Sequence, residues 1–299
     1  MKLIKTLLLT TLFSPLYAQQ PADSLKYKVE AGVAVSNGDY APVWLTANRY
    51  GMAGNEPNFA YVRAGAEWNK VLPKDWRIDV GLDLAGGKNL SSKFWVQQAY
   101  ADVSWKALTL SIGSKERPGF PLAKNEKLTS GWMVEGTNMR PIPQVRVEVK
   151  DYLNVPGTKG WMAFKGYLSY GYFTDGDWQK DFVAPGQVYT TGVLYHSKSL
   201  MFRLGNREKL PVEFEFGLLT GAQFGGKQMR KNADGSVSLE KDMPQGIKDF
   251  WKVFFPKQES TLQNVEGNHC GSWNFALNYY VGDWKFKAYL EHYFEDHSQ

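Results

Sequence analysis

Apolar and polar residues alternate along most of this chain. The clearest stretches of period two cover residues 25–36, 76–84, 144–150, 212–218, 273–281 and 284–290. Because successive side chains of a β-strand point to opposite faces of a sheet, this alternation predicts strands with one apolar and one polar face. Weaker patterns predict further strands at 57–70, 92–105, 107–114, 160–173, 186–196 and 199–206. We therefore expect an all-β protein of about eleven to thirteen mostly antiparallel strands, with a two-residue hairpin turn at Gly282-Asp283.

One segment has helical spacing instead. Ile247, Phe250, Trp251 and Phe254 recur at intervals of three and four residues, and Pro256 follows them. This pattern predicts a short amphipathic helix near 245–255, which either packs against the body of the protein or lies on a membrane surface. No Ser/Pro-rich linker divides the remaining chain, so we treat residues 19–299 as one domain.

The composition favours an all-β protein and excludes several alternatives. Aromatic residues make up 15% of the 299 residues, 29 residues are Gly, and the mean hydropathy is −0.40. The single cysteine, Cys270, excludes an intramolecular disulfide framework and a Cys-rich zinc site. Beyond the first few positions there is no apolar run of about 18 residues, so we expect no transmembrane helix.

Residues 1–18 have the features of a secretory signal peptide. Lys2 and Lys5 precede the apolar stretch 7–13, and the small residue Ala18 stands at a plausible cleavage point. Export from the cytoplasm is therefore predicted. Removal of this segment leaves 33 of the 35 Lys and Arg residues against 30 acidic ones, a net charge of +3. Such a small excess does not predict a nucleic-acid partner.

Two architectures fit the alternation: a soluble periplasmic β-sandwich and an antiparallel transmembrane β-barrel of the outer membrane. Four features favour the barrel. Strands of about 9–13 residues are long enough to cross a bilayer at a tilt. Tight turns occur beside long polar connections such as 115–130 and 226–244, and an export signal accompanies the lack of disulfides. Aromatic residues also stand near strand ends, as in interface girdles: Tyr27, Trp76, Trp105, Trp273 and Trp284.

Candidate catalytic and metal-binding groups are sparse. The histidines at 196, 269, 292 and 297 are too dispersed for a spaced metal motif, and Asp175-Gly176-Asp177 is interpreted as a plain turn. Glu213 and Glu215 share a strand face, as a glycosidase pair would, but such carboxylates also line the wet interior of a barrel. We expect no enzymatic activity, no metal and no cofactor.

Four short motifs occur in order along the chain: 42–51 (PVWLTANRYG), 130–132 (SGW) followed by 137–143 (TNMRPIP), 267–273 (GNHCGSW) and 293–296 (YFED). Together they resemble the Wzi-type capsule assembly protein family, in its Bacteroides-like outer-membrane branch. They cover nearly the whole chain after the signal peptide. The resemblance implies a large outer-membrane β-barrel with helical elements that acts at the cell surface as a lectin for capsular polysaccharide.

The resemblance also predicts that the chain is the N-terminal part of a longer, truncated or interrupted protein. Family members continue well past the Phe-Glu-Asp motif, whereas His297-Ser298-Gln299 ends this chain. Unpaired edge strands leave backbone groups without partners in lipid. We therefore expect residues 19–299 to be an incomplete barrel domain that does not form the functional barrel alone.

The predicted function is that of an outer-membrane, cell-surface protein that attaches or helps to assemble capsular or exopolysaccharide. Outer-membrane lipid and the outer-membrane assembly machinery are its further expected partners. The alternative is a porin-like outer-membrane channel, which shares the polar interior but needs an open pore.

Polysaccharide binding needs flat aromatic rings to stack on sugars, and Asn, Asp or Arg side chains to bind hydroxyl and acidic groups. Trp132, Asn138 and Arg140 meet this description on a segment expected to be a loop, and Asn268 and His269 meet it less clearly. Each residue also has a structural interpretation. Asn138 and Arg140 would fix the turn before Pro141, and Trp132 would belong to an aromatic girdle.

Overall fold

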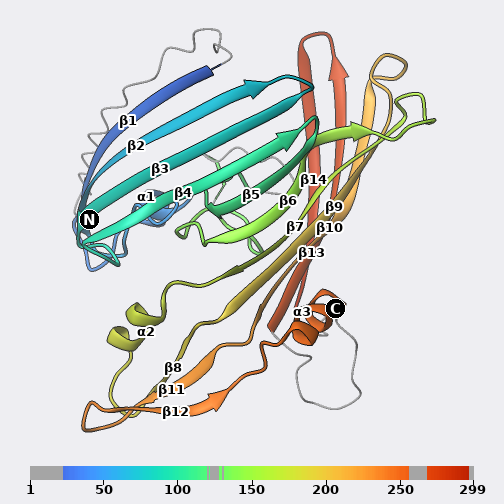
Figure 1. The fold of residues 1–299 in the computed structure, drawn as a ribbon. Helices are drawn as coiled ribbons and strands as arrows, with labels where there is room; N and C mark the ends of the chain where they lie inside the picture. The colour runs from blue at the N-terminus through green and yellow to red at the C-terminus, as the bar shows by residue number, and fades with distance from the viewer. Residues whose placement is uncertain (1–22, 120, 122–127, 130, 256–267, 296–299) are drawn as a thin grey trace. The chain divides into compact units, whose positions relative to one another are not determined.

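A computed structural model describes residues 23–119, 121, 128–129, 131–255 and 268–295 (Figure 1). The predicted signal peptide at 1–18 lies outside these residues, as do 256–267 and 296–299. The chain divides into two compact units, the N-terminal unit (Met1–Pro141) and the C-terminal unit (Ile142–Gln299). Each unit is built around an antiparallel sheet, so the predicted all-β fold is confirmed.

The N-terminal unit holds five consecutive strands, each paired with the next along the chain. They are β1 (Asp23–Val35), β2 (Asn58–Leu72), β3 (Trp76–Lys88), β4 (Phe94–Trp105) and β5 (Leu108–Ser114). The short helix α1 (Val43–Thr46) lies in the β1–β2 connection. Tight turns join β2 to β3 and β4 to β5, and Lys74, Asp75 and Lys106 take positive φ angles there. The other connections are longer.

The C-terminal unit has a six-stranded sheet in the order β6-β7-β9-β10-β13-β14. Its strands are β6 (Gln144–Asn154), β7 (Met162–Tyr172), β9 (Leu194–Leu204), β10 (Val212–Phe224), β13 (Asn268–Val281) and β14 (Trp284–Glu295). A smaller sheet pairs β8 (Val188–Thr191) and β12 (Val237–Asp242) with β11 (Lys227–Lys231). Two helices complete the unit, α2 (Gly176–Phe182) and α3 (Ile247–Phe254). No helix among the described residues is long and apolar enough to cross a bilayer.

Most predicted elements are present, and helix α1 was not predicted. Three further differences concern predicted segments. The two strands expected at 186–196 and 199–206 are β8 and β9, and they divide at 192–193 instead. The stretch 226–244, expected to be a polar connection, contains β11 and β12. The plain turn expected at Asp175-Gly176-Asp177 is wrong, because α2 begins at Gly176 with Asp175 as its N-cap residue. The predicted helix near 245–255 is confirmed as α3.

The two faces of the N-terminal sheet have the reverse of the usual arrangement. One face, here called its inner face, buries polar and charged side chains: Arg63, Asn69, Asp79, Asp83, Asp102, Thr109 and Ser111. The opposite face, its outer face, exposes apolar side chains: Leu25, Val29, Val62, Val80, Leu82, Leu84, Val103, Leu110 and Ile112. Water-soluble proteins bury apolar and expose charged residues. The sheet therefore follows the predicted alternation, with the charged face buried.

The C-terminal sheet repeats this reversal. Its inner face buries Arg146, Glu148, Ser169, Ser199, Glu213, Glu215, Ser272, Asn274 and Asn278. Its outer face exposes Val145, Val147, Leu168, Leu200, Phe214, Leu277, Tyr279, Phe286 and Leu290. Buried ions and amides are costly unless they are paired. We therefore expect the buried polar groups of each inner face to bond to partners within their own unit.

Candidate functional site

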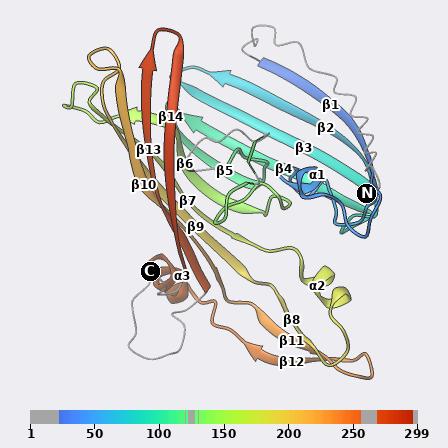
Figure 2. The same ribbon diagram turned by 180° about the vertical axis from the view of Figure 1, so that it is seen from behind.

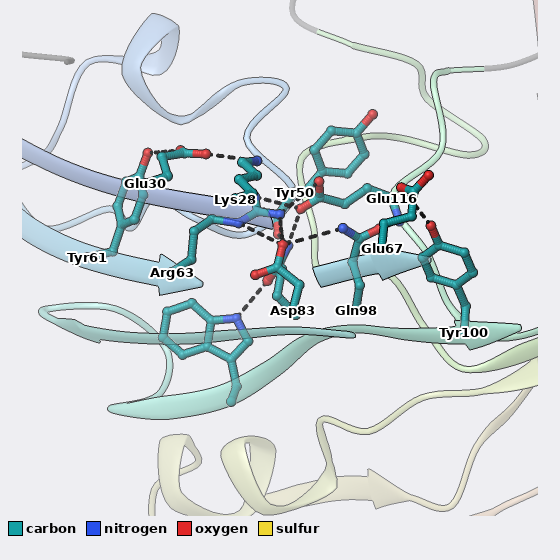
Figure 3. Close-up of polar contacts among 12 residues, drawn as sticks. Lys28, Glu30, Tyr50, Tyr61, Arg63, Glu67, Asp83, Gln98, Tyr100 and Glu116 are labelled. Carbon is teal, nitrogen blue, oxygen red and sulfur yellow. Dashed lines mark hydrogen bonds and ion pairs between the residues drawn. The ribbon is translucent and has the colours of Figure 1, made fainter. Parts of the chain in front are cut away.

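The inner face of the N-terminal unit carries a buried ion cluster centred on Arg63 (Figure 3). Arg63, on β2, places its guanidinium between Asp83 on β3 and Glu116 in the segment after β5. Nε donates to Asp83 Oδ2 at 3.0 Å, Nη1 donates to Glu116 Oε1 at 3.0 Å, and Nη2 donates to both carboxylates. The Arg63 and Asp83 side chains are each only 5% exposed. One buried cation thus joins two anions from different segments.

A β-bulge extends this cluster to a neighbouring strand. The register between β3 and β4 shifts after Asp83, which leaves Gln97 as an extra residue on β4. Gln97 Nε2 donates to Glu116 Oε1 at 2.8 Å and to the backbone oxygen of Tyr50 at 2.8 Å. Gln98 Oε1 accepts from the backbone N–H of Glu116 at 2.9 Å. The two adjacent glutamines therefore fix the segment after β5 and the β1–β2 connection to the sheet.

Tyrosine rings cover glycines on the same inner face. Tyr61 lies opposite Gly32 in the β1–β2 register, and a Cβ atom at Gly32 would overlap the Tyr61 ring. The Tyr61 hydroxyl donates to Glu30 at 2.6 Å, and Glu30 also pairs with Lys28 at 2.9 Å. Tyr100 repeats the arrangement over Gly81 and reaches Glu67 at 3.1 Å. Glu30 and Glu67 thus each accept a hydrogen bond from a tyrosine hydroxyl of a nearby strand, and Lys28 adds a positive charge beside Glu30.

Apolar side chains of the β1–β2 connection pack on the inner face. Met52 joins Tyr61, Ala85 and Trp95 in one buried cluster, and Leu45 joins Ala34 and Phe59 in a second. A cavity of about 20 Å³ remains beside Arg49 and Tyr61. That volume holds roughly one water molecule. The connection therefore covers this part of the inner face (Figure 2).

Two of the sequence motifs meet in space and form what we call the loop pair, residues 48–51 and 137–140. Asn48 has a φ angle of 55° and is its centre. Asn48 Nδ2 donates to the backbone oxygen of Thr129 at 2.7 Å, and its Oδ1 accepts from the Thr137 hydroxyl at 2.7 Å. The backbone N–H groups of Tyr50 and Gly51 donate to the carbonyls of Thr137 and Asn138 at 2.8 and 2.9 Å. Segments almost ninety positions apart are thus held as one surface.

Three predicted site residues lie in or beside the loop pair, in different environments. Trp132 is only 7% exposed and its ring covers Gly119, so its faces are packed within the protein. Asn138 is exposed, and its Oδ1 accepts from the backbone N–H of Asn48 at 2.7 Å. This bond ties Asn138 to the β1–β2 connection. Its role in sugar binding stays a prediction.

Arg140 is a cation that has no acidic partner among the described residues. Its guanidinium stacks on the Trp95 ring at 4.2 Å, and Nη2 donates to Ser91 Oγ at 2.7 Å. Its buried Nε has no hydrogen-bond partner in the described part of the chain. Burial lowers the pKa of Arg140 below its ordinary value, although a guanidinium keeps its charge at neutral pH. Arg63 has two carboxylate partners, whereas Arg140 has none within the part of the chain that the structure describes.

Asn268 and His269 belong to the C-terminal unit, where they begin β13. Asn268 is exposed and pairs with Gln223 of β10, while His269 is half-buried and pairs with Ala222. Trp132, Asn138 and Arg140 belong to the N-terminal unit.

Glu213 and Glu215, considered above as a catalytic pair, both lie on the inner face of the C-terminal sheet. Tyr280 donates to Glu213 at 2.7 Å. Tyr152 and Asn278 donate to Glu215 at 2.8 and 2.6 Å. These bonds are of the same kind as those of Glu30 and Glu67. Within the described ranges, no group of three His, Cys, Asp or Glu side chains is arranged to hold a metal ion.

Replacement of Asn48 by alanine should destabilise the protein by about 2 kcal/mol, because it removes the side-chain hydrogen bonds to Thr129 and Thr137 at a residue with positive φ. Urea unfolding followed by tryptophan fluorescence measures this loss. Asn89→Ala is the matched control, since Asn89 also has positive φ but its exposed side chain makes one bond, to the Asn58 oxygen. Equal losses in the two variants would contradict a central role for Asn48.

No family model matches the chain, and no curated protein matches it significantly. The relation to capsule assembly proteins therefore depends on the four sequence motifs and stays a prediction.

Proposed function

We propose that this chain forms part of an outer-membrane β-barrel that holds capsular or exopolysaccharide at the cell surface. The observation that carries the membrane part is the reversal of the sheet faces in both units. Exposed Leu, Val and Ile side chains on one face and buried, paired ions on the other suit a sheet between lipid and a polar interior. In water, the same outer faces would leave an unusually large apolar surface uncovered.

The positions of aromatic residues support the same orientation. Trp76 begins β3 and Trp105 ends β4, so both stand beside the tight turns of the N-terminal sheet. Their ring centroids are 6.2 Å apart. Trp284 stands beside the tight β13–β14 turn of the C-terminal sheet. Tryptophans concentrate at the two membrane interfaces of barrels, and short turns face the periplasm. The longer connections, including the loop pair, then face the cell exterior.

Polysaccharide retention is supported by the loop pair and by the resemblance of its two motifs to capsule assembly proteins. Arg140 offers a guanidinium that has no acidic partner in the described ranges, and Asn138 offers an exposed amide. Guanidinium groups bind carboxylates with two parallel hydrogen bonds. An acidic polysaccharide would supply the negative partner that Arg140 lacks among the described residues.

The porin-like alternative is favoured by the polar inner faces, which resemble the lining of a water channel. The covering of the N-terminal inner face by Leu45 and Met52, and the pairing of its ions, favour a closed interior instead. Conductance in planar bilayers separates the two. A surface lectin should give little steady current, whereas stable large openings would support the channel.

Arg140→Ala should weaken binding of the host strain's purified polysaccharide by about ten-fold or more, since a hydrogen bond to a charged group contributes about 1.5–3 kcal/mol. Biolayer interferometry with the full-length protein measures the affinity. The variant also loses the stacking on Trp95 and the bond to Ser91, so urea unfolding should show a loss of stability of about 1 kcal/mol. Arg230→Ala is the control, since Arg230 is paired with Glu240 in the small sheet. Unchanged affinity in Arg140→Ala would remove Arg140 from the binding surface.

A further inference from the structure

Helix α3 lies on the outer face of the C-terminal sheet, beside the end of β10 (Figures 1 and 2). Phe250 packs against Tyr170 of β7 and Phe224 of β10, with ring centroids 5.1 and 5.2 Å apart. Val253 is only 1% exposed and clusters with Ala222 and Phe224. One side of the helix is therefore fixed on the apolar face of the sheet.

The helix covers two polar residues on this face. His196 and Lys198 are on the same side of β9 as the exposed Leu200. His196 stacks on Tyr170 at 4.3 Å, and its Nδ1 lies 3.0 Å from the Ser169 oxygen. The Lys198 ammonium donates to the backbone oxygen of Phe254, at the C-terminal end of α3 where cations are favoured. An uncovered ammonium on a lipid-facing surface would be costly, and α3 removes that cost.

The other sides of α3 form two parallel stripes. Ile247, Trp251 and Phe255, spaced four residues apart, are 81%, 65% and 60% exposed. The Trp251 and Phe255 rings are nearly parallel, with centroids 6.4 Å apart. Next to this apolar stripe are the exposed Lys248 and Lys252. The helix thus presents a packed side, an exposed apolar side and a cationic side in that order around its axis.

We infer that α3 lies in the membrane–water interface of one leaflet of the outer membrane. Its apolar stripe lies among the acyl chains and its lysines lie at anionic headgroups. This inference rests on the proposed membrane position of the sheet. Two observations select lipid as the occupant. The stripe belongs to a helix seated on the outer apolar face, so one hydrophobic layer would cover both. The adjoining lysines match anionic headgroups, as in helices that lie flat in an interface and bury their apolar side about 5–10 Å deep.

The test uses single cysteines in a Cys270→Ser background of the full-length protein, each labelled with the fluorophore NBD. Trp251→Cys reports on the stripe, Leu277→Cys reports on the outer face of the sheet, and Leu239→Cys on β12 is the exposed control. The proteins are reconstituted into vesicles of zwitterionic and anionic phospholipid that carry a doxyl quencher near the headgroup end of the acyl chain. We expect about two-fold quenching at 251, as for an interfacial helix, and none at 239.

The outcomes separate the inference from the proposed function. Quenching at 277 without quenching at 251 overturns the helix inference and leaves the membrane sheet in place. Absence of quenching at both positions overturns both. If added unlabelled protein, and not the doxyl lipid, changes the signal at 251, a second copy covers the stripe and the lipid assignment is wrong.

A charge reversal tests the lysine stripe. Lys248→Glu combined with Lys252→Glu should reduce quenching at 251 in anionic vesicles and leave it unchanged in purely zwitterionic ones. Equal quenching with and without the reversal in anionic vesicles would overturn the assignment of these lysines to headgroups.

Discussion

Replacement of Arg63 by methionine should destabilise the protein by about 3–5 kcal/mol, the usual loss when one partner of a buried ion pair is removed. Methionine keeps much of the arginine volume, so the change acts mainly on charge. Asp83, 5% exposed, and Glu116, 16% exposed, would then face each other without the cation between them. Urea unfolding monitored by tryptophan fluorescence measures the loss.

Two further variants make this result specific to the buried cluster. In Arg63→Met combined with Asp83→Leu, the more buried of the two carboxylate partners is also removed, and part of the lost stability should return. Lys28→Met is the matched control, because the Lys28 side chain is 51% exposed and its pair with Glu30 should contribute less than about 1 kcal/mol. A loss in Arg63→Met as small as in Lys28→Met would show that the cluster is not a source of stability.

The strands could be predicted because their alternation is a property of neighbouring residues. The alternation with period two is visible in the segments from Leu25 to Val35 and from Trp76 to Leu84. Alternation does not tell which face is buried, since a sandwich and a lipid-facing sheet have the same pattern. The exposure of Leu82 and the burial of Asp83 beside it show which face is buried. This burial depends on which face the connections cover.

The ion cluster could not be predicted from local patterns. Arg63, Asp83 and Glu116 are each one polar residue among many, and their meeting depends on the register of three segments and on the bulge at Gln97. A one-residue shift would turn Arg63 to the outer face. The available signal is that Arg63 and Asp83 stand in two predicted strands that follow each other along the chain.

The loop pair could be predicted from the sequence only in part. The family resemblance links its two motifs in the sequence. Their direct contact depends on the positive φ of Asn48 and on its bonds to Thr129 and Thr137. The flat ring of Trp132 makes it a candidate for stacking on sugars. Its burial against Gly119 depends on how the surrounding segment folds back. Side-chain type alone does not reveal such packing.

A charge on the outer face should separate a lipid-facing sheet from a water-facing one. Leu82 is at the centre of β3, is 52% exposed, and has Ala66 and Ala99 opposite it on the flanking strands. In a membrane, Leu82→Arg should cost about 2–4 kcal/mol, as basic residues do at the bilayer midplane of barrels. In water, an exposed substitution of this kind should change stability by no more than about 0.5 kcal/mol.

The measurement is urea unfolding of the full-length protein in vesicles, together with the fraction of protein that resists extraction from membranes. Leu239→Arg is the control, because Leu239 is similarly exposed, at 53%, but lies on β12 of the small sheet. A loss at Leu82 and none at Leu239 would place lipid against β3. If both variants behave like the wild type and remain in the aqueous phase, the outer face meets water and the β-sandwich is the better architecture. The sign of a single substitution thus decides what the alternating sequence leaves open.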